Sequence, residues 1–238
     1  WIFVAGGVLI SQLAHLNPTH SGLLLGIFYG GPGFGIVLCS LFLPEIISYA
    51  TESRWTHAWQ FGWLGLAAVC GLMTVLLAKP VLSIPAIPTR SDSHIGTPLR
   101  RYALVLAGYF MFGVGYIGYM TFIVALLKEM GLSPFTLYTF YAMLAMAVML
   151  SSRIWASFLQ KHRSGMPLAT LNALLGLACL IPALIAMTRS ALDGLMMIAI
   201  FASGLLFGAV FLSAVASTTA FVKHNLPAAD WVGGITAF

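Results

Sequence analysis

The absence of charge over long stretches limits the fold of this chain more than any other feature. Six windows contain no Asp, Glu, Lys or Arg: 1–44, 55–78, 102–127, 130–152, 164–188 and 194–222. Roughly 20 apolar helical residues cross a bilayer core of about 30 Å. Each window therefore predicts one membrane-spanning helix, and the first window predicts two.

The composition excludes a water-soluble domain. The chain is 60% hydrophobic and 7% charged, whereas about a quarter of the residues of a globular protein are charged. The apolar stretches are also continuous, without the alternating segments of about 10 residues that are typical of membrane β-barrels. These features predict an all-α, polytopic transmembrane helix bundle.

The apolar runs predict six complete spans: 22–43, 59–78, 102–127, 135–156, 166–187 and 194–220. Partial spans are predicted at 1–14 and 231–238. Trp1 and Phe238 both lie in apolar runs, so we expect the chain to be truncated at both ends. The three cysteines fall inside spans, where we expect them to serve as small packing residues.

The basic residues predict the orientation in the membrane. Connections between successive spans alternate between the two sides, and eight basic residues fall on one of them: Lys79, Arg90, Arg100, Arg101, Arg153, Lys161, Arg163 and Lys223. The other side has three, Arg54, Lys128 and Arg189. Lys and Arg concentrate in cytoplasmic loops, so the side with eight is predicted to be cytoplasmic. The net charge of +5 therefore reflects topology, and we expect a lipid bilayer rather than a nucleic acid as partner.

The longest hydrophilic stretch, 79–101, divides the chain. It contains four prolines and four basic residues, a composition typical of a linker. It predicts a cytoplasmic connection between two helical bundles. Residues 1–78 would be the C-terminal part of the first bundle, with three spans, the first partial. Residues 102–238 would be the second, with four spans and the start of a fifth.

The span at 22–43 is rich in glycine and contains a proline. In lipid, small residues on one helix face let a second helix approach closely, and an internal proline kinks a helix. The residues predicted to form this packing and flexing segment are Gly22, Gly26, Gly30, Gly31, Pro32 and Gly35.

This segment resembles the fifth helix of the major facilitator superfamily, which often carries a G-P-x-x-G signature associated with antiporters. Gly31, Pro32 and Gly35 match the signature. The family pattern also has a glycine four residues before its G-P glycine, where this chain has Ile27. The resemblance implies a transporter, while this departure weakens the antiporter inference.

Two further features resemble the same superfamily. The segment 151–165 (SSRIWASFLQKHRSG) lies where a cytoplasmic basic loop recurs, and it keeps Arg153, Lys161 and Arg163 but lacks the Asp of the usual motif. The sequences HLNP at 15–18 and HNLP at 224–227 would be equivalent loops in two pseudo-repeated halves. In this frame the chain covers helices four to eleven of twelve.

The segments THAWQFGWLGLAA and GYIGYMTFIVALL resemble the uncharacterised bacterial YbfB/YjiJ-type branch. The resemblance implies a secondary transporter in a bacterial inner membrane, monomeric and without a cofactor or metal. Its partner would be a small solute, moved by alternating access of two bundles. The alternative is a membrane binding or structural protein, or a receptor, that transports nothing. An enzyme is not expected, because no nucleophile and base, paired carboxylates or metal cluster lies within a span.

The resemblance also implies which residues line the solute cavity. Helices one, four, seven and ten line it in the superfamily, which corresponds here to 1–14, 102–127 and 194–220. The polar candidates on these spans are Ser11, Gln12, Tyr109, Tyr116, Tyr119, Thr121, Ser203, Ser213 and Ser217. Asn172, also inside a span, is expected to make an interhelical hydrogen bond.

Proton coupling usually depends on a carboxylate inside the membrane, and no charge-free window contains one. Glu45, directly after Pro44 at the end of a span, is the coupling candidate within this chain. A carboxylate in preceding helices is the other possibility.

Overall fold

The computed structural model describes residues 2–16, 21–84, 99–188, 194–227, 234–235 and 238. This part of the chain is all-helical, as predicted. Its seven long helices are α1 (Ile2–Leu16), α2 (Ser21–Glu52), α3 (Trp59–Leu82), α4 (Leu99–Glu129), α5 (Pro134–Lys161), α6 (Met166–Thr188) and α7 (Gly194–Asn225).

The six complete spans predicted from sequence are confirmed as helices. Each of α2 to α7 is long and apolar enough to cross a membrane. The predicted partial span at 1–14 corresponds to α1, which has 15 residues. Most of the other partial span, 231–238, lies outside the described residues.

Several helices extend beyond the predicted spans. Helix α2 continues from residue 43 to Glu52 and includes Pro32 and Pro44, so the proline expected to kink the helix does not end it. The sequence argument counts the apolar residues that cross the hydrocarbon core, but backbone hydrogen bonding continues into the polar region. For the same reason α3 includes the first residues of the predicted 79–101 linker and α4 includes its last residues. Residues 85–98 of the linker lie outside the described part.

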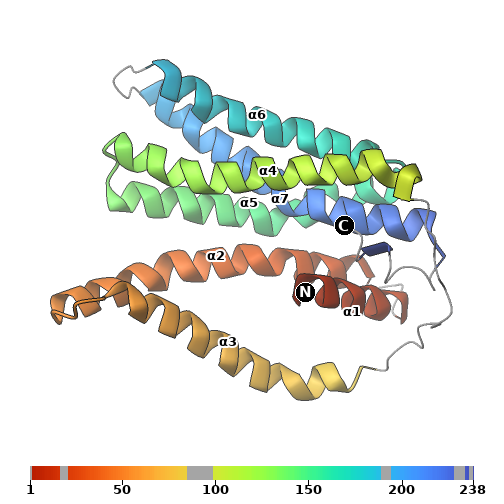
Figure 1. The fold of residues 1–238 in the computed structure, drawn as a ribbon, viewed down its shortest axis with the longest axis horizontal. Coiled ribbons are helices and arrows are strands. Elements are labelled where there is room, and N and C mark those ends of the chain that lie inside the picture. Colours follow the sequence, from red (N-terminus) through yellow and green to blue (C-terminus); the bar gives the residue numbers. More distant parts are fainter. Residues whose placement is uncertain (1, 17–20, 85–98, 189–193, 228–233, 236–237) are drawn as a thin grey trace.

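The helices form one compact bundle with a looser extension (Figure 1). Helix α7 packs against α5 and α6, and α4 packs mainly against α6. Helix α2 packs along α5 and in turn contacts α1 and α3. Nearly all residues of α3 are exposed. The helix diverges from the other helices along its length (Figure 1). Its large apolar side chains suit contact with lipid.

The core lies where α5, α6 and α7 meet. Phe140, Leu144, Leu171 and Phe207 are fully buried there. A side chain at Gly208 of α7 would collide with the backbone carbonyl of Leu144 on α5. The two helices therefore approach at backbone distance, as small residues allow in membrane proteins.

Candidate functional site

Aromatic rings from α4 and α7 form a continuous stack along the contact between the two helices. On α4, Phe112 lies 5.5 Å from Tyr109 and 5.8 Å from Tyr116, measured between ring centroids. Across the contact, Phe211 of α7 lies 4.9 Å from Tyr116. Tyr109 and Tyr116 are half-buried, so the stack packs the two helices without burying either tyrosine completely. The structure thus brings together two tyrosines that the sequence analysis singled out.

Tyr119 continues this stack and adds a hydrogen-bond chain. Its ring lies 4.1 Å from that of Phe207, and its hydroxyl oxygen is 2.9 Å from Ser203 Oγ. Ser203 Oγ donates to the carbonyl oxygen of Ala178 on α6, at 2.8 Å. A serine hydroxyl has one proton, so in this arrangement Tyr119 donates to Ser203.

Pro182 explains why the carbonyl of Ala178 accepts a side-chain hydrogen bond. Proline has no N–H, so the carbonyl four residues earlier in a helix has no backbone donor. Ser203 from α7 fills that role. The Tyr119 oxygen donates its proton within this chain and retains lone pairs, so it can still accept a hydrogen bond. One polar chain therefore joins α4, α7 and α6 and leaves an acceptor.

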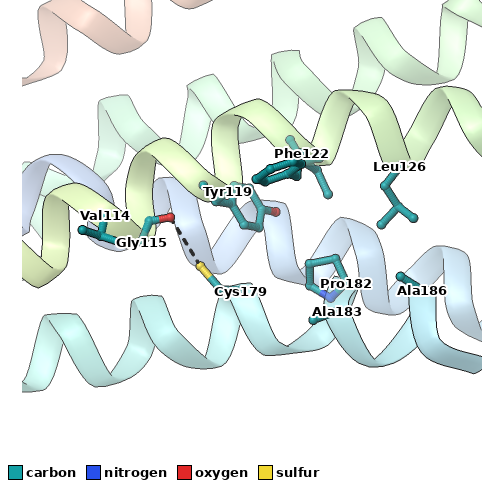
Figure 2. Close-up of a pocket in the computed structure, with 11 residues that line it drawn as sticks. Val114, Gly115, Tyr119, Phe122, Leu126, Cys179, Pro182, Ala183 and Ala186 are labelled. Atoms are coloured by element: carbon teal, nitrogen blue, oxygen red, sulfur yellow. Dashed lines mark hydrogen bonds between the residues drawn. The ribbon is translucent and has the colours of Figure 1, made fainter.

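A cavity of about 380 Å³ lies beside Tyr119, between α4 and α6. Figure 2 shows Tyr119 and Phe122 on one wall and Pro182 and Ala183 on the other. Cys179 Sγ lies 3.8 Å from the carbonyl oxygen of Gly115 and makes a weak contact across the two helices. The walls are almost entirely apolar, so the cavity suits an apolar group.

The remaining predicted cavity residues do not gather in one place. Thr121 is exposed, and Gln12 of α1 is half-buried. Ser217 is buried and bonds to the carbonyl of Ala214 in its own helix. Ser213 is buried with no hydrogen-bond partner among the described residues. The side chain of Ser11 is outside the described part.

The glycine segment of α2 packs against α5 at a different glycine from those predicted. A side chain at Gly33 would come within 2.9 Å of the carbonyl oxygen of Ala145. Gly30 lies near α5 as well, because a Cβ atom at this position would be 3.6 Å from the carbonyl oxygen of Met149. A side chain at Gly31 or Gly35 would meet no atom within 4 Å. Gly22 and Gly26 belong to α2, but their surroundings are outside the described part.

Pro32 and Gly35 line a crevice between α2 on one side and α4 and α5 on the other. The crevice has a volume of about 550 Å³ and extends along α2 as far as Pro44. Its other wall comes from α4 and α5 and includes Lys128 and Tyr141. Two residues of the predicted packing motif, Pro32 and Gly35, therefore face this crevice. Glu45 follows Pro44 and is exposed.

At the other end α2 is in contact with α7. We call this the basic end, because Arg153, Lys161, Arg163 and Lys223 lie toward it. Here the hydroxyl of Tyr29 on α2 donates to Thr219 Oγ1 on α7, at 2.9 Å.

The predicted cytoplasmic basic loop is mostly helical, which corrects the sequence interpretation. Helix α5 continues to Lys161, so Arg153 and Lys161 are exposed helical residues. Only Arg163 lies in the connection to α6. The helix persists because the segment contains no proline or glycine before Gly165 to interrupt it. Asn172 makes the expected interhelical bond, from Nδ2 to the carbonyl of Gly108, at 2.8 Å.

Sequence reasoning missed three contacts between helices. Tyr29 and Thr219 were not singled out, nor was Gly33 or the bond from Trp155 Nε1 to the carbonyl of Ala209, at 2.8 Å. Tyr29 and Trp155 carry a weak signal, since tyrosine and tryptophan within a span usually find a polar partner. Their partners depend on how the helices are aligned, which one sequence does not reveal. No group of His, Cys, Asp or Glu in the described part could hold a metal ion.

The six described helices that are long and apolar enough to cross a membrane define an integral membrane protein. The profile of the family described as "Uncharacterised MFS-type transporter YbfB" matches residues 1–236. The chain belongs to this family of the major facilitator superfamily, which confirms the resemblance found in the sequence. No curated protein and no solved structure gives a significant match.

Proposed function

We propose that the protein is a secondary transporter that moves a small solute by alternating access. In this mechanism the group formed by α1, α2 and α3 rocks against the bundle of α4 to α7. The observation that carries the proposal is the asymmetry of the contact between α2 and the bundle. It is closed by Tyr29 and Thr219 at the basic end and separated at the other end by the crevice of about 550 Å³.

This asymmetry corresponds to one state of such a cycle. The distribution of basic residues predicts that the basic end is cytoplasmic. The structure would then represent a transporter that is closed toward the cytoplasm and open toward the outside. Rocking would break the bond between Tyr29 and Thr219 and narrow the crevice. The contacts at Gly33 lie between the two ends, where a fulcrum is needed.

The solute is proposed to contact the α4–α7 stack between the two ends. Tyr109 and Tyr116 offer partly exposed phenols, and Tyr119 offers an acceptor oxygen. These groups suit a solute with an apolar or aromatic part and a hydrogen-bond donor. Glu45 is the acidic group that we propose to test for proton coupling, because it adjoins the crevice on an exposed stretch of α2.

The test begins with binding and ends with flux. Purified protein is screened for thermal stabilisation by a panel of small solutes, and uptake of each stabilising solute is measured in proteoliposomes and protein-free liposomes. Saturable uptake that depends on the protein supports the proposal. Binding without uptake favours a receptor or structural membrane protein.

A cross-link tests alternating access in the same assay. In a variant without the native cysteines, Tyr29→Cys and Thr219→Cys are joined by a short bifunctional thiol reagent that spans the original side-chain contact. Uptake should stop after cross-linking and remain with either cysteine alone. Continued uptake with the basic end cross-linked would contradict alternating access.

A further inference from the structure

A small pocket at the basic end lies apart from the crevice and from the aromatic stack. It has a volume of about 180 Å³ and is formed by α2, α5 and α7. Its walls are mainly apolar and include Leu159 and Ala220. Ser152, Gln160, Lys223 and His224 also line it. We call it the basic-end pocket.

Lys223 and Gln160 supply most of the hydrogen-bond donors of this pocket. Lysine provides three N–H donors and no acceptor, and the amide of glutamine provides two donors beside its acceptor oxygen. None of the described residues that line the pocket carries a carboxylate, and the described acidic residues Glu45, Glu52 and Glu129 lie toward the opposite end of the bundle. Lys223 has other interactions in the structure, and three donors allow it to serve more than one acceptor. The lining therefore complements an anion.

Hydrogen bonds connect the helices that surround the pocket. Asn225 Nδ2 lies 2.9 Å from the carbonyl oxygen of Arg163 and 2.8 Å from that of Phe221. The bond to Arg163 holds the end of α7 against the α5–α6 connection, whereas the bond to Phe221 lies within α7. Tyr29, bonded to Thr219, forms part of the wall from α2. A pre-formed frame lowers the ordering cost of binding.

The size and position of the pocket limit what can bind. Clefts for whole small molecules commonly measure about 300–1,000 Å³, so this pocket suits one compact group. Lys223 and His224 are in the last turn of α7, where a membrane-spanning helix reaches the lipid head groups. Cations in a last turn also stabilise the helix carbonyls, but that role requires neither a pocket nor a ligand.

We propose that the basic-end pocket binds a phosphate group. Lys223 and Gln160 donate hydrogen bonds to its oxygens, and the apolar walls receive the carbon atoms attached to it. The group comes either from an anionic phospholipid of the adjacent leaflet or from phosphate in solution. Bound there, it links α7 to α5 beside α2 and stabilises the closed basic end. This site does not depend on the identity of the transported solute.

The experiment compares ligands that differ only in this group. The melting temperature of purified protein is measured with phosphatidylglycerol, with diacylglycerol of the same acyl chains, and with inorganic phosphate alone. Native mass spectrometry counts the retained lipid. We expect phosphatidylglycerol to raise the melting temperature and be retained, and diacylglycerol to do neither. An equal rise with inorganic phosphate alone would support the site and assign the group to solution.

Variants assign the effect to the pocket. Lys223→Gln should abolish the rise, whereas Lys161→Gln should keep it, because Lys161 is an exposed lysine toward the same end and outside the lining. If Lys223→Gln does not fold, Gln160→Ala and Lys223→Arg replace it, with a reduced and a retained rise expected. Equal loss in Lys161→Gln and Lys223→Gln, or an equal rise with diacylglycerol, would overturn the proposal.

Discussion

The hydroxyl of Tyr29 donates to Thr219 Oγ1 at 2.9 Å, and this buried bond joins α2 to α7 across 190 positions of sequence. Both side chains are almost fully buried, at 4% and 8% exposure. A buried hydroxyl that loses its partner costs about 1–3 kcal/mol. The bond therefore favours the closed arrangement of the basic end, and breaking it is part of the cost of opening.

Removing this hydroxyl should open the basic end more often. Tyr29→Phe keeps the ring and loses the donor, so the closed state should lose about 1 kcal/mol of stability. Opening is measured as the rate at which a water-soluble thiol reagent modifies Ala216→Cys, a position in the wall of the basic-end pocket. The rate should rise severalfold. Tyr49→Phe, which changes an exposed tyrosine of the same helix, is the control and should leave the rate unchanged.

Removing successive groups of the hydrogen-bond chain at Tyr119 should lower stability by different amounts. Tyr119→Phe keeps the stacking on Phe207 and leaves the bond from Ser203 to Ala178, so it should cost about 1 kcal/mol. Ser203→Ala removes the donor to the Ala178 carbonyl and the acceptor of Tyr119, so it should cost more, about 1–3 kcal/mol. Thermal unfolding in detergent measures both. Thr121→Val, at an exposed hydroxyl, should have almost no effect, and equal costs for all three would refute the chain.

Two neighbouring glycines of α2 should respond in opposite ways to alanine. Gly33→Ala places a methyl group within 2.9 Å of the α5 backbone, and overpacking of this kind costs about 1–3 kcal/mol. Gly31→Ala meets no atom within 4 Å and removes the helix penalty of glycine, up to about 1 kcal/mol. Melting temperatures should therefore fall for the first variant and stay or rise for the second. The reverse order would place the α2–α5 contact elsewhere.

The sequence predicted the helices well because one physical rule determines them. A window such as 194–222 must be a helix if it lies in lipid, since each backbone group needs a partner there. The end of α5 was less predictable, because charge marks where a span leaves the hydrocarbon core and not where the helix stops. Lys161 was consequently placed beyond the predicted span of 135–156, although it lies on the helix.

The site was only partly predictable from the sequence. Tyr119 and Ser203 were each candidates on general grounds, and the structure shows that they are bonded to each other. The pairing of Tyr29 with Thr219 depends on the alignment of α2 with α7 across the two groups of helices. Gly33 contacts α5 where Gly31 and Gly35 meet no atom within 4 Å, because the spacing of glycines gives a helix face but not its neighbour.

Alternating access is tested most directly by distances at both ends of the α2 contact. Spin labels on Glu52 and Phe135 report the end with the crevice, and labels on Ile27 and Lys161 report the basic end; all four residues are exposed. Tyr29→Phe should shift the two distance distributions in opposite directions, longer at the basic end and shorter at the crevice. Distances that stay constant, or that lengthen together, would contradict a rocking transporter.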